Sequence, residues 1–214
     1  MVKDMEIMKT GTTTLAIKCK EGIVLAADKR ATAGNFIANK NVDKIFEITK
    51  NMAITTAGSV SDIQFLLKLI KAELRLKRIR TGRTLNVKEA ANLLAGMVYQ
   101  NIRQLSAIPG ISHFLFAGYD NSGFYLYDLY PDGSLTETDD FVSSGSGSVI
   151  AYGVLESQYK KGMSIDEGIK LAIKSVNAAL QRDSASGNGL DVVVINGKGV
   201  KKVLTKELNT TIEA

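Results

Sequence analysis

Residues 12–28 read TTTLAIKCKEGIVLAAD, and they hold two runs of β-branched and aliphatic residues. The runs Thr12–Lys20 and Ile23–Asp28 flank Glu21-Gly22, a pair that favours a turn. This pattern predicts a β-hairpin whose first strand begins at Thr12. A further strand is expected over Met52–Thr56, and Ala57-Gly58-Ser59 follows it as the point where a strand gives way to a helix.

Hydrophobic residues then recur at the spacing of amphipathic helices in two segments. We expect two long helices after the first strands, each with one apolar face toward the core. The first carries Ile63, Leu66, Leu67, Ile70 and Leu74, and the second carries Val87, Ala91, Leu94, Val98, Ile102 and Leu105.

The second half of the chain repeats this order of strands followed by helices. Alternating residues around Asp120-Asn121-Ser122-Gly123 predict a hairpin, and Ser164-Ile165-Asp166-Glu167 is a capping box that opens a helix. The expected elements are strands over Phe114–Tyr119, Phe124–Tyr130 and Phe141–Ser144, helices over Ser148–Tyr159 and from Ser164 onward, and a last hairpin of Asp191–Ile195 and Val200–Leu204.

The order of strands, two helices, strands, two helices, strands disfavours a doubly wound parallel fold, which would alternate strand and helix. We expect an α+β protein in which two sheets stack between helix pairs. A chain of 214 residues with 45% hydrophobic content is long enough for one complete core, which predicts a single domain.

The formal charge of +5 permits nucleic-acid binding as an alternative, but the basic residues are dispersed. The densest cluster, Lys68 to Arg83, lies along one predicted helix and is typical of a solvated helix face. Zinc patterns and aromatic-plus-basic patterns are lacking. We therefore expect no nucleic-acid partner.

One cysteine, Cys19, cannot form an intramolecular disulfide, which indicates a reducing compartment and predicts a cytoplasmic protein. No apolar run reaches the ~20 residues of a membrane span, so no membrane association is expected. Met1–Gly11 carries charges where a secretory signal would be apolar, so this segment needs another explanation.

The inventory of reactive residues excludes several chemistries. One histidine, His113, and one cysteine leave too little for a zinc site or a Cys-His pair, so we expect no metal. A Ser-His-Asp triad would need His113, but no G-x-S-x-G elbow is present, and a structural role fits this residue better. Gly145-Ser146-Gly147-Ser148 lacks the third glycine of a phosphate-binding loop, and a tight turn into a helix explains it equally well.

Hydrolysis without histidine requires a hydroxyl that an amine activates. An α-amino group has a pKa near ~7.7–8, so part of it is unprotonated at neutral pH. Thr12 would supply both nucleophile and base if the bond before it were cut. The alternative is that Thr12–Thr14 simply favours a strand.

Several spaced motifs resemble those of proteasome beta subunits, which are N-terminal nucleophile hydrolases. The likeness extends from Thr12 to Leu204 and implies a four-layer αββα sandwich of two antiparallel sheets. The matching motifs are Gly11-Thr12-Thr13-Thr14-Leu15-Ala16, the run from Ala27 to Asn35, Lys44, Thr55 to Ser59, Gly145 to Ser148 with Ala151 to Leu155, and Arg182 to Gly187.

The resemblance implies a role for each matching residue. Thr12 would be the nucleophile, Lys44 a nearby cation that Asp28 holds in place, and Gly58 the donor of an oxyanion N–H. Ser146, Asp183 and Ser186 would support the threonine amine, although ordinary loop capping is an alternative for these three. Residues 1–11 would be a propeptide that Thr12 removes by attacking Gly11, and residues 12–214 the mature domain.

The same resemblance implies a cleft for an extended peptide. Arg30 and Thr32 would flank it, and Thr32 and Gly58 would bind peptide main chain. A mostly apolar pocket predicts a chymotrypsin-like preference. The residues expected to line the pocket are Ala31, Val42, Phe46, Thr56 and Val60.

The family works as a cylinder of four seven-membered rings, with two beta rings between two alpha rings. The expected partners are alpha subunits, other beta subunits, an ATP-dependent regulatory particle and unfolded protein substrates, with no cofactor. The sequence resembles the archaeal type. Two alternatives stay open: a non-catalytic ring subunit, or another N-terminal nucleophile amidohydrolase, against which the Gly145–Ser148 and Arg182–Gly187 blocks weigh.

Overall fold

The computed structural model describes residues 11–106 and 110–208. Most of the propeptide expected from the sequence, residues 1–10, lies outside these ranges. The described chain forms two five-stranded antiparallel sheets, a separate two-stranded hairpin and four helices.

The first sheet contains the hairpin expected at the start of the chain. Its strand order is β10-β1-β2-β11-β12, and each neighbouring pair is antiparallel. The strands are β1 (Thr14–Cys19), β2 (Gly22–Asp28), β10 (Phe141–Ser144), β11 (Gly189–Asn196) and β12 (Gly199–Glu207).

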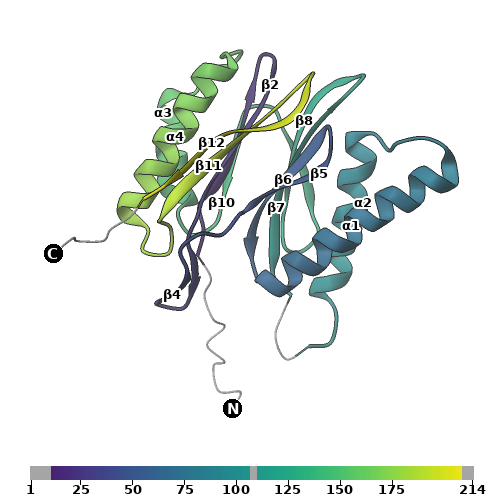
Figure 1. Cartoon of the computed structure of the whole chain (residues 1–214), viewed down its shortest axis with the longest axis horizontal. Helices are drawn as coiled ribbons and strands as arrows, with labels where there is room; N and C mark the ends of the chain where they lie inside the picture. The colour runs from purple at the N-terminus through teal and green to yellow at the C-terminus, as the bar shows by residue number, and fades with distance from the viewer. Residues whose placement is uncertain (1–10, 107–109, 209–214) are drawn as a thin grey trace.

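The second sheet is a meander of consecutive strands in the order β5-β6-β7-β8-β9. The small hairpin of β3 and β4 projects beyond the two sheets at one end of the molecule (Figure 1). The remaining strands are β3 (Ala31–Ala33), β4 (Phe36–Asn39), β5 (Ile45–Thr49), β6 (Met52–Gly58), β7 (Ser112–Asp120), β8 (Gly123–Leu129) and β9 (Leu135–Thr138).

Each sheet is covered on its outer face by one helix pair, and the inner faces meet (Figure 1). The four-layer αββα sandwich expected from the sequence is thereby confirmed. The helices α3 (Ser148–Gln158) and α4 (Ile165–Arg182) pack on the first sheet, and α1 (Val60–Thr81) and α2 (Val87–Ile102) pack on the second.

Strand alternation explains the three buried layers. Leu15 and Ile17 of β1 point toward α3 and α4, whereas Ala16 between them points into the space between the sheets. Leu115 and Leu126 meet Ala16 in this middle layer. The core therefore consists of three layers, one between the two sheets and one between each sheet and its helix pair.

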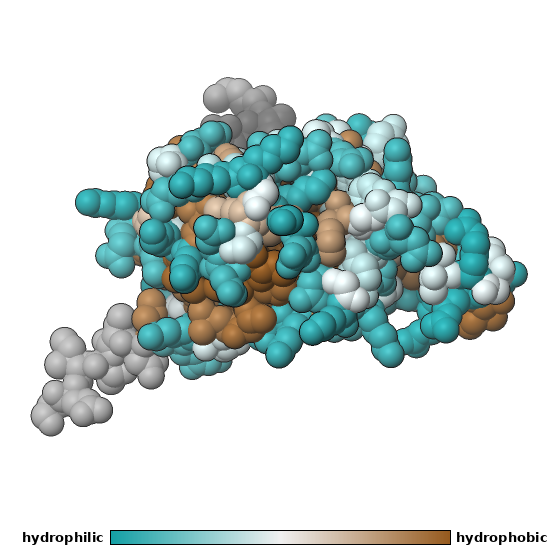
Figure 2. Space-filling model, turned by 90° about the horizontal axis from the view of Figure 1, so that it is seen from above, coloured by the Kyte–Doolittle hydropathy of each residue, from teal (hydrophilic) through white to brown (hydrophobic). Residues whose placement is uncertain are grey.

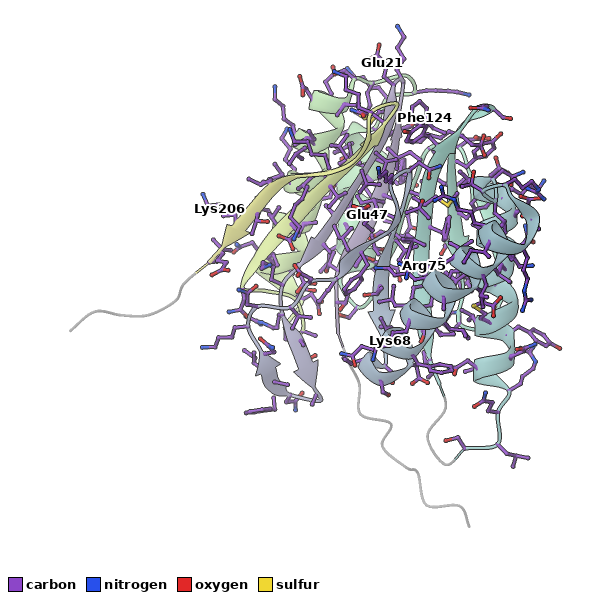
Figure 3. All side chains as sticks on the ribbon, turned by 45° about the vertical axis from the view of Figure 1, so that its right-hand side comes forward. Glu21, Glu47, Lys68, Arg75, Phe124 and Lys206 are labelled. Atoms are coloured by element: carbon purple, nitrogen blue, oxygen red, sulfur yellow. The ribbon has the colours of Figure 1, made fainter. Side chains whose placement is uncertain are left out.

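Capping hydrogen bonds and a left-handed glycine explain where three of the helices begin or end. Ser164 caps α4 through the capping box read from the sequence, and Asn86 forms a second capping box on α2. α1 ends at Gly82, whose φ of 70° suits a residue without a side chain. Lys68 and Arg75 lie on the exposed face of α1 (Figure 3), as expected of a solvated helix face.

Three details differ from the expectations. The first strand begins at Thr14 rather than Thr12, because residues 12–13 turn their backbone groups to other partners. α2 ends at Ile102, and Leu105 lies beyond it, fully exposed. The strands β3, β4, β5 and β9 were not expected at all.

Candidate active site

Thr12 lies immediately before β1, at the end of the sandwich where the chain enters the first sheet, and it is buried. Its backbone N–H donates to Ser146 Oγ at 3.2 Å, and its carbonyl accepts from the Gly147 N–H at 3.3 Å. The chain continues through Gly11, so this nitrogen is an amide here. The turn between β10 and α3 therefore holds both the N–H and the carbonyl of Thr12.

Lys44 and Asp28 form a buried ion pair beside this position. Lys44 Nζ lies 2.5 Å from Asp28 Oδ1, and the residues are 5% and 1% exposed. The carboxylate also accepts the backbone N–H groups of Thr13, Arg30 and Gly187 at 2.9–3.0 Å. Four donors therefore offset the cost of burying the Asp28 charge.

Burial lowers the pKa of the Lys44 ammonium below its ordinary value, and the charge and hydrogen bond of Asp28 act in the opposite direction. Burial prevails because little solvent reaches the ammonium. The site therefore holds a cation that releases its proton more readily than a surface lysine.

A hydroxyl and carboxylate network connects Thr12 and Thr13 to the end of α4. Asp183 Oδ2 accepts from Ser146 Oγ at 2.7 Å and from Ser186 Oγ at 2.6 Å. Ser186 Oγ is hydrogen bonded to Thr13 Oγ1 at 2.7 Å. Asp183 Oδ1 also accepts the backbone N–H of residue 185 within its own turn.

The glycines between β10 and α3 allow the turn to approach Thr12 and Thr13. Gly145 has a φ of 93°, and a Cβ there would overlap the Thr12 carbonyl. A Cβ on Gly147 would overlap Thr13 Oγ1. The turn leads directly into α3 at Ser148, as the tight-turn interpretation predicts.

Gly58 ends β6 with a φ of 122°, and it lines a groove together with Thr12 and Lys44. A Cβ at this position would overlap the Ile111 carbonyl oxygen, so the backbone conformation requires glycine. Glycine at residue 58 therefore allows the end of β6 to take the conformation that it has beside the groove.

A groove brings together nearly all the residues that the sequence assigned to a peptide pocket. Arg30 is the exception, because its guanidinium donates to Asn188 Oδ1 at 2.8 Å and to the Ser184 carbonyl at 2.9 Å. The groove is lined by Gly11, Thr12, Ala31, Thr32, Val42, Asp43, Lys44, Phe46, Thr56, Ala57, Gly58, Val60, Ile63 and Gln64.

Sequence reasoning missed four lining residues: Asp43, Ala57, Ile63 and Gln64. Ile63 and Gln64 follow Val60 by three and four positions on α1, so helical spacing alone would have indicated them. Asp43 and Ala57 are chain neighbours of residues that were predicted.

His113 contacts residues on neighbouring strands, away from the groove. Its Nε2 lies 2.6 Å from Asp128 Oδ1, its Nδ1 lies 2.7 Å from Ser144 Oγ, and its ring stacks on Tyr130 with centroids 4.9 Å apart. Ser144 is buried, and none of these residues lines the groove. The set joins β7, β8 and β10 across the two sheets, which supports a structural role rather than a serine hydrolase.

Within residues 11–106 and 110–208, no group of three or more His, Cys, Asp and Glu side chains could hold a metal ion. Across the same described residues, none of the helices is both long and apolar enough to span a bilayer.

The four-layer fold, with a threonine at the head of its first strand beside a buried lysine, is that of N-terminal nucleophile hydrolases. A family model described as proteasome subunit matches residues 8–195. The chain therefore belongs to the proteasome subunit family.

Three archaeal proteins named proteasome subunit beta illustrate the similarity. The one from Ferroglobus placidus is 43% identical over 203 residues, which cover 95% of each chain. The one from Methanococcus aeolicus is 45% identical over 95% of this chain and 92% of its own. The one from Archaeoglobus fulgidus is 44% identical over 86% of this chain and 85% of its own.

Proposed function

We propose that the chain is a catalytic beta subunit of the proteasome core particle and acts as a threonine endopeptidase. The observation that carries this proposal is the position of Thr12 in an apolar groove that also contains Lys44 and Gly58. Family membership supports the assignment. A structural ring subunit would have no need for a buried ion pair and a backbone conformation that requires glycine at this groove.

The mechanism begins with release of the Thr12 amine. Thr12 Oγ1 attacks the scissile carbonyl carbon while the free α-amino group accepts the hydroxyl proton, and the carbonyl oxygen becomes an oxyanion. The Gly58 N–H is assigned to that oxyanion, and the Lys44 ammonium favours both the neutral amine and the developing alkoxide. The amine then protonates the leaving nitrogen, and water hydrolyses the ester.

Ser146, Asp183 and Ser186 position the amine in this scheme. Ser146 Oγ already accepts the Thr12 N–H and donates to Asp183, so a free amine at the same place would keep this partner. Asp28 orients Lys44 in the same way. These residues place groups and do not themselves react.

Gly11 supports removal of residues 1–11 by Thr12 itself. Its N–H donates to Thr32 Oγ1 at 3.0 Å, so the bond before Thr12 enters the groove alongside β3. A Cβ on Gly11 would overlap the Ala185 side chain and approach Ser146 Oγ. Only glycine leaves the Gly11 carbonyl in its present position.

Gly11→Ala is therefore expected to slow self-cleavage by roughly 100-fold, because a displacement of about 1 Å has effects of that size on reacting groups. Intact mass over time after assembly measures the rate. Gly96→Ala is the matched control, since Gly96 has open space around its Cβ position. Cleavage of Gly11→Ala at the wild-type rate would contradict this account of Gly11.

The groove favours apolar side chains before the cut, because Ala31, Val42, Phe46 and Val60 line it. We expect peptides with leucine before the scissile bond to be cleaved at least ~10-fold faster than matched peptides with glutamate there. Initial rates of fluorogenic peptides that differ at this one residue measure the preference. Equal rates would remove the chymotrypsin-like assignment.

Large apolar side chains that stay exposed support assembly with other subunits. Phe36, Ile79 and Val149 are 72%, 75% and 78% exposed. Figure 2 shows a patch of hydrophobic residues on an otherwise largely hydrophilic face. From membership of the proteasome subunit family we further infer a four-ring cytoplasmic particle with seven-membered alpha and beta rings, into which an ATP-dependent regulator delivers unfolded proteins.

A further inference from the structure

The segment of residues 41–44 lies between β4 and β5 and forms one wall of the groove, and we call it the pocket-wall segment. It supplies Val42, Asp43 and Lys44 to the lining and has no regular strand pairing of its own. Its position therefore depends on individual contacts. On the groove side these are the Val42 N–H to the Lys29 carbonyl at 3.0 Å and the Thr56 N–H to the Lys44 carbonyl at 2.9 Å.

Two consecutive residues of this segment form ion pairs with two consecutive residues at the end of β2. Asp28 pairs with Lys44, and the next residue, Lys29, lies 3.8 Å from Asp43 Oδ1 through its Nζ. The first pair lies at the groove beside Thr12. The second pair also reaches the groove through Asp43, and it contacts Asp191 of β11 and Lys202 of β12.

The second pair belongs to a cluster of two carboxylates and two ammonium groups. Lys202 Nζ on β12 lies 3.1 Å from Asp43 Oδ1 and 3.4 Å from Asp191 Oδ2. Lys29 Nζ lies 3.2 Å from the same Asp191 oxygen, and both of these side chains are 3% exposed. Since the cluster has no net charge, each member depends on the others for compensation.

The contacts within the cluster shift the pKa values of Asp43 and Lys202 toward their charged forms. The hydrogen bond from Lys202 holds the pKa of the Asp43 carboxyl below its usual value against a smaller effect of burial. Burial tends to lower the pKa of Lys202, but its contacts with Asp43 and Asp191 together raise it. Both groups are thus charged at neutral pH.

A second contact joins the pocket-wall segment to the same strand. Asn41 Nδ2 donates to Glu207 Oε1 at 2.6 Å, five residues beyond Lys202 on β12. β12 is an edge strand with mostly exposed residues, so few of its side chains pack in the core. Lys202 and Glu207 of β12 therefore contact two residues of the pocket-wall segment, Asp43 and Asn41.

We propose that Asp43 and Lys202 are positioning residues for the peptidase site: β12 holds the pocket-wall segment through them and thereby sets the place of Lys44 and Val42. This inference rests on the proposed function. Lys202 is not itself part of the groove lining, and its contact with the lining is the ion pair with Asp43, so it acts through that residue.

The test compares Lys202→Met with Lys201→Met in the full-length chain assembled with its alpha subunits. Lys201 is the adjacent residue of β12 and is exposed, so its variant controls for loss of one charge from the strand. The readouts are kcat and KM for a peptide with leucine before the cut, together with the melting temperature. Lys202→Arg tests rescue by a side chain that keeps the charge.

We expect Lys202→Met to lower kcat/KM by ~10-fold, chiefly through kcat, because Lys44 is displaced from Thr12. Lys201→Met should match wild type, and Lys202→Arg should recover most of the loss. The double variant Asp43→Asn/Lys202→Met should have no lower kcat/KM than either single variant, since both changes break the same Asp43–Lys202 contact. If Lys202→Met does not assemble, Lys202→Gln compared with Lys201→Gln gives the same test outside the groove lining.

Kinetic constants of Lys202→Met equal to those of Lys201→Met would overturn the inference, even if the melting temperature fell. Additive losses in the double variant would also overturn it. An assembled wild-type particle without peptidase activity would overturn the proposed function, and this inference with it.

Discussion

Thr12→Ala is expected to reduce peptide hydrolysis by at least ~10⁴-fold, because losses of this size follow removal of a covalent nucleophile. The change deletes Oγ1 and keeps the backbone N–H that Ser146 Oγ accepts. Initial rates with a fluorogenic peptide, in particles of wild type and variant at equal concentration, measure the effect.

Two controls separate catalysis from maturation. A chain that starts directly at residue 12 removes the need for self-cleavage, and Thr12→Ala in that chain should be equally inactive. Thr12→Ser keeps a hydroxyl and should retain measurable hydrolysis. Substantial activity of Thr12→Ala in either form would mean that another residue is the nucleophile.

Lys44→Met is expected to have the second largest effect, with at least ~100-fold less hydrolysis because the cation near Thr12 is gone. Removing one partner of a buried pair also leaves an uncompensated charge, which costs about 3–5 kcal/mol in the free energy of unfolding. Asp28 is 1% exposed, so solvent offers it little compensation. Peptide hydrolysis and thermal unfolding of the assembled particle measure the two losses.

The double variant Asp28→Asn/Lys44→Met distinguishes these losses. It removes the unpaired charge, so part of the stability should return while activity stays low. Lys40→Met, at an exposed lysine, should change neither quantity. Full activity in Lys44→Met would contradict the role given to the ammonium.

The fold could be predicted from the sequence wherever a long periodic pattern faced a core. α1, α2 and the capping box at Ser164 follow directly from spacing and local hydrogen bonding. β3, β4 and β9 are strands of three or four residues with many exposed or half-buried positions, so they carry little periodic signal. The helical spacing that extends to Leu105 has no core to face beyond Ile102.

The site was predictable to a different degree for each residue. The shortage of histidine and cysteine and the chemistry of an α-amino group indicate Thr12 as a candidate, but only the family resemblance favours it over an ordinary strand residue. The assignments of Lys44, Asp28 and Asp183 needed the family resemblance, because the residues of each contact are far apart in the sequence. The cluster of Lys29, Asp43, Asp191 and Lys202 was not foreseen, since dispersed charges are ordinarily typical of a solvated surface.

The central claim is that Thr12 becomes the amino terminus and the nucleophile. Intact mass and N-terminal sequencing, after this chain assembles with its alpha subunits and beside a Thr12→Ala control, test it most directly. We predict a new terminus at Thr12 in wild type and an uncut chain in the control. An assembled wild-type particle that keeps Met1 as its terminus would contradict the claim and indicate a structural ring subunit.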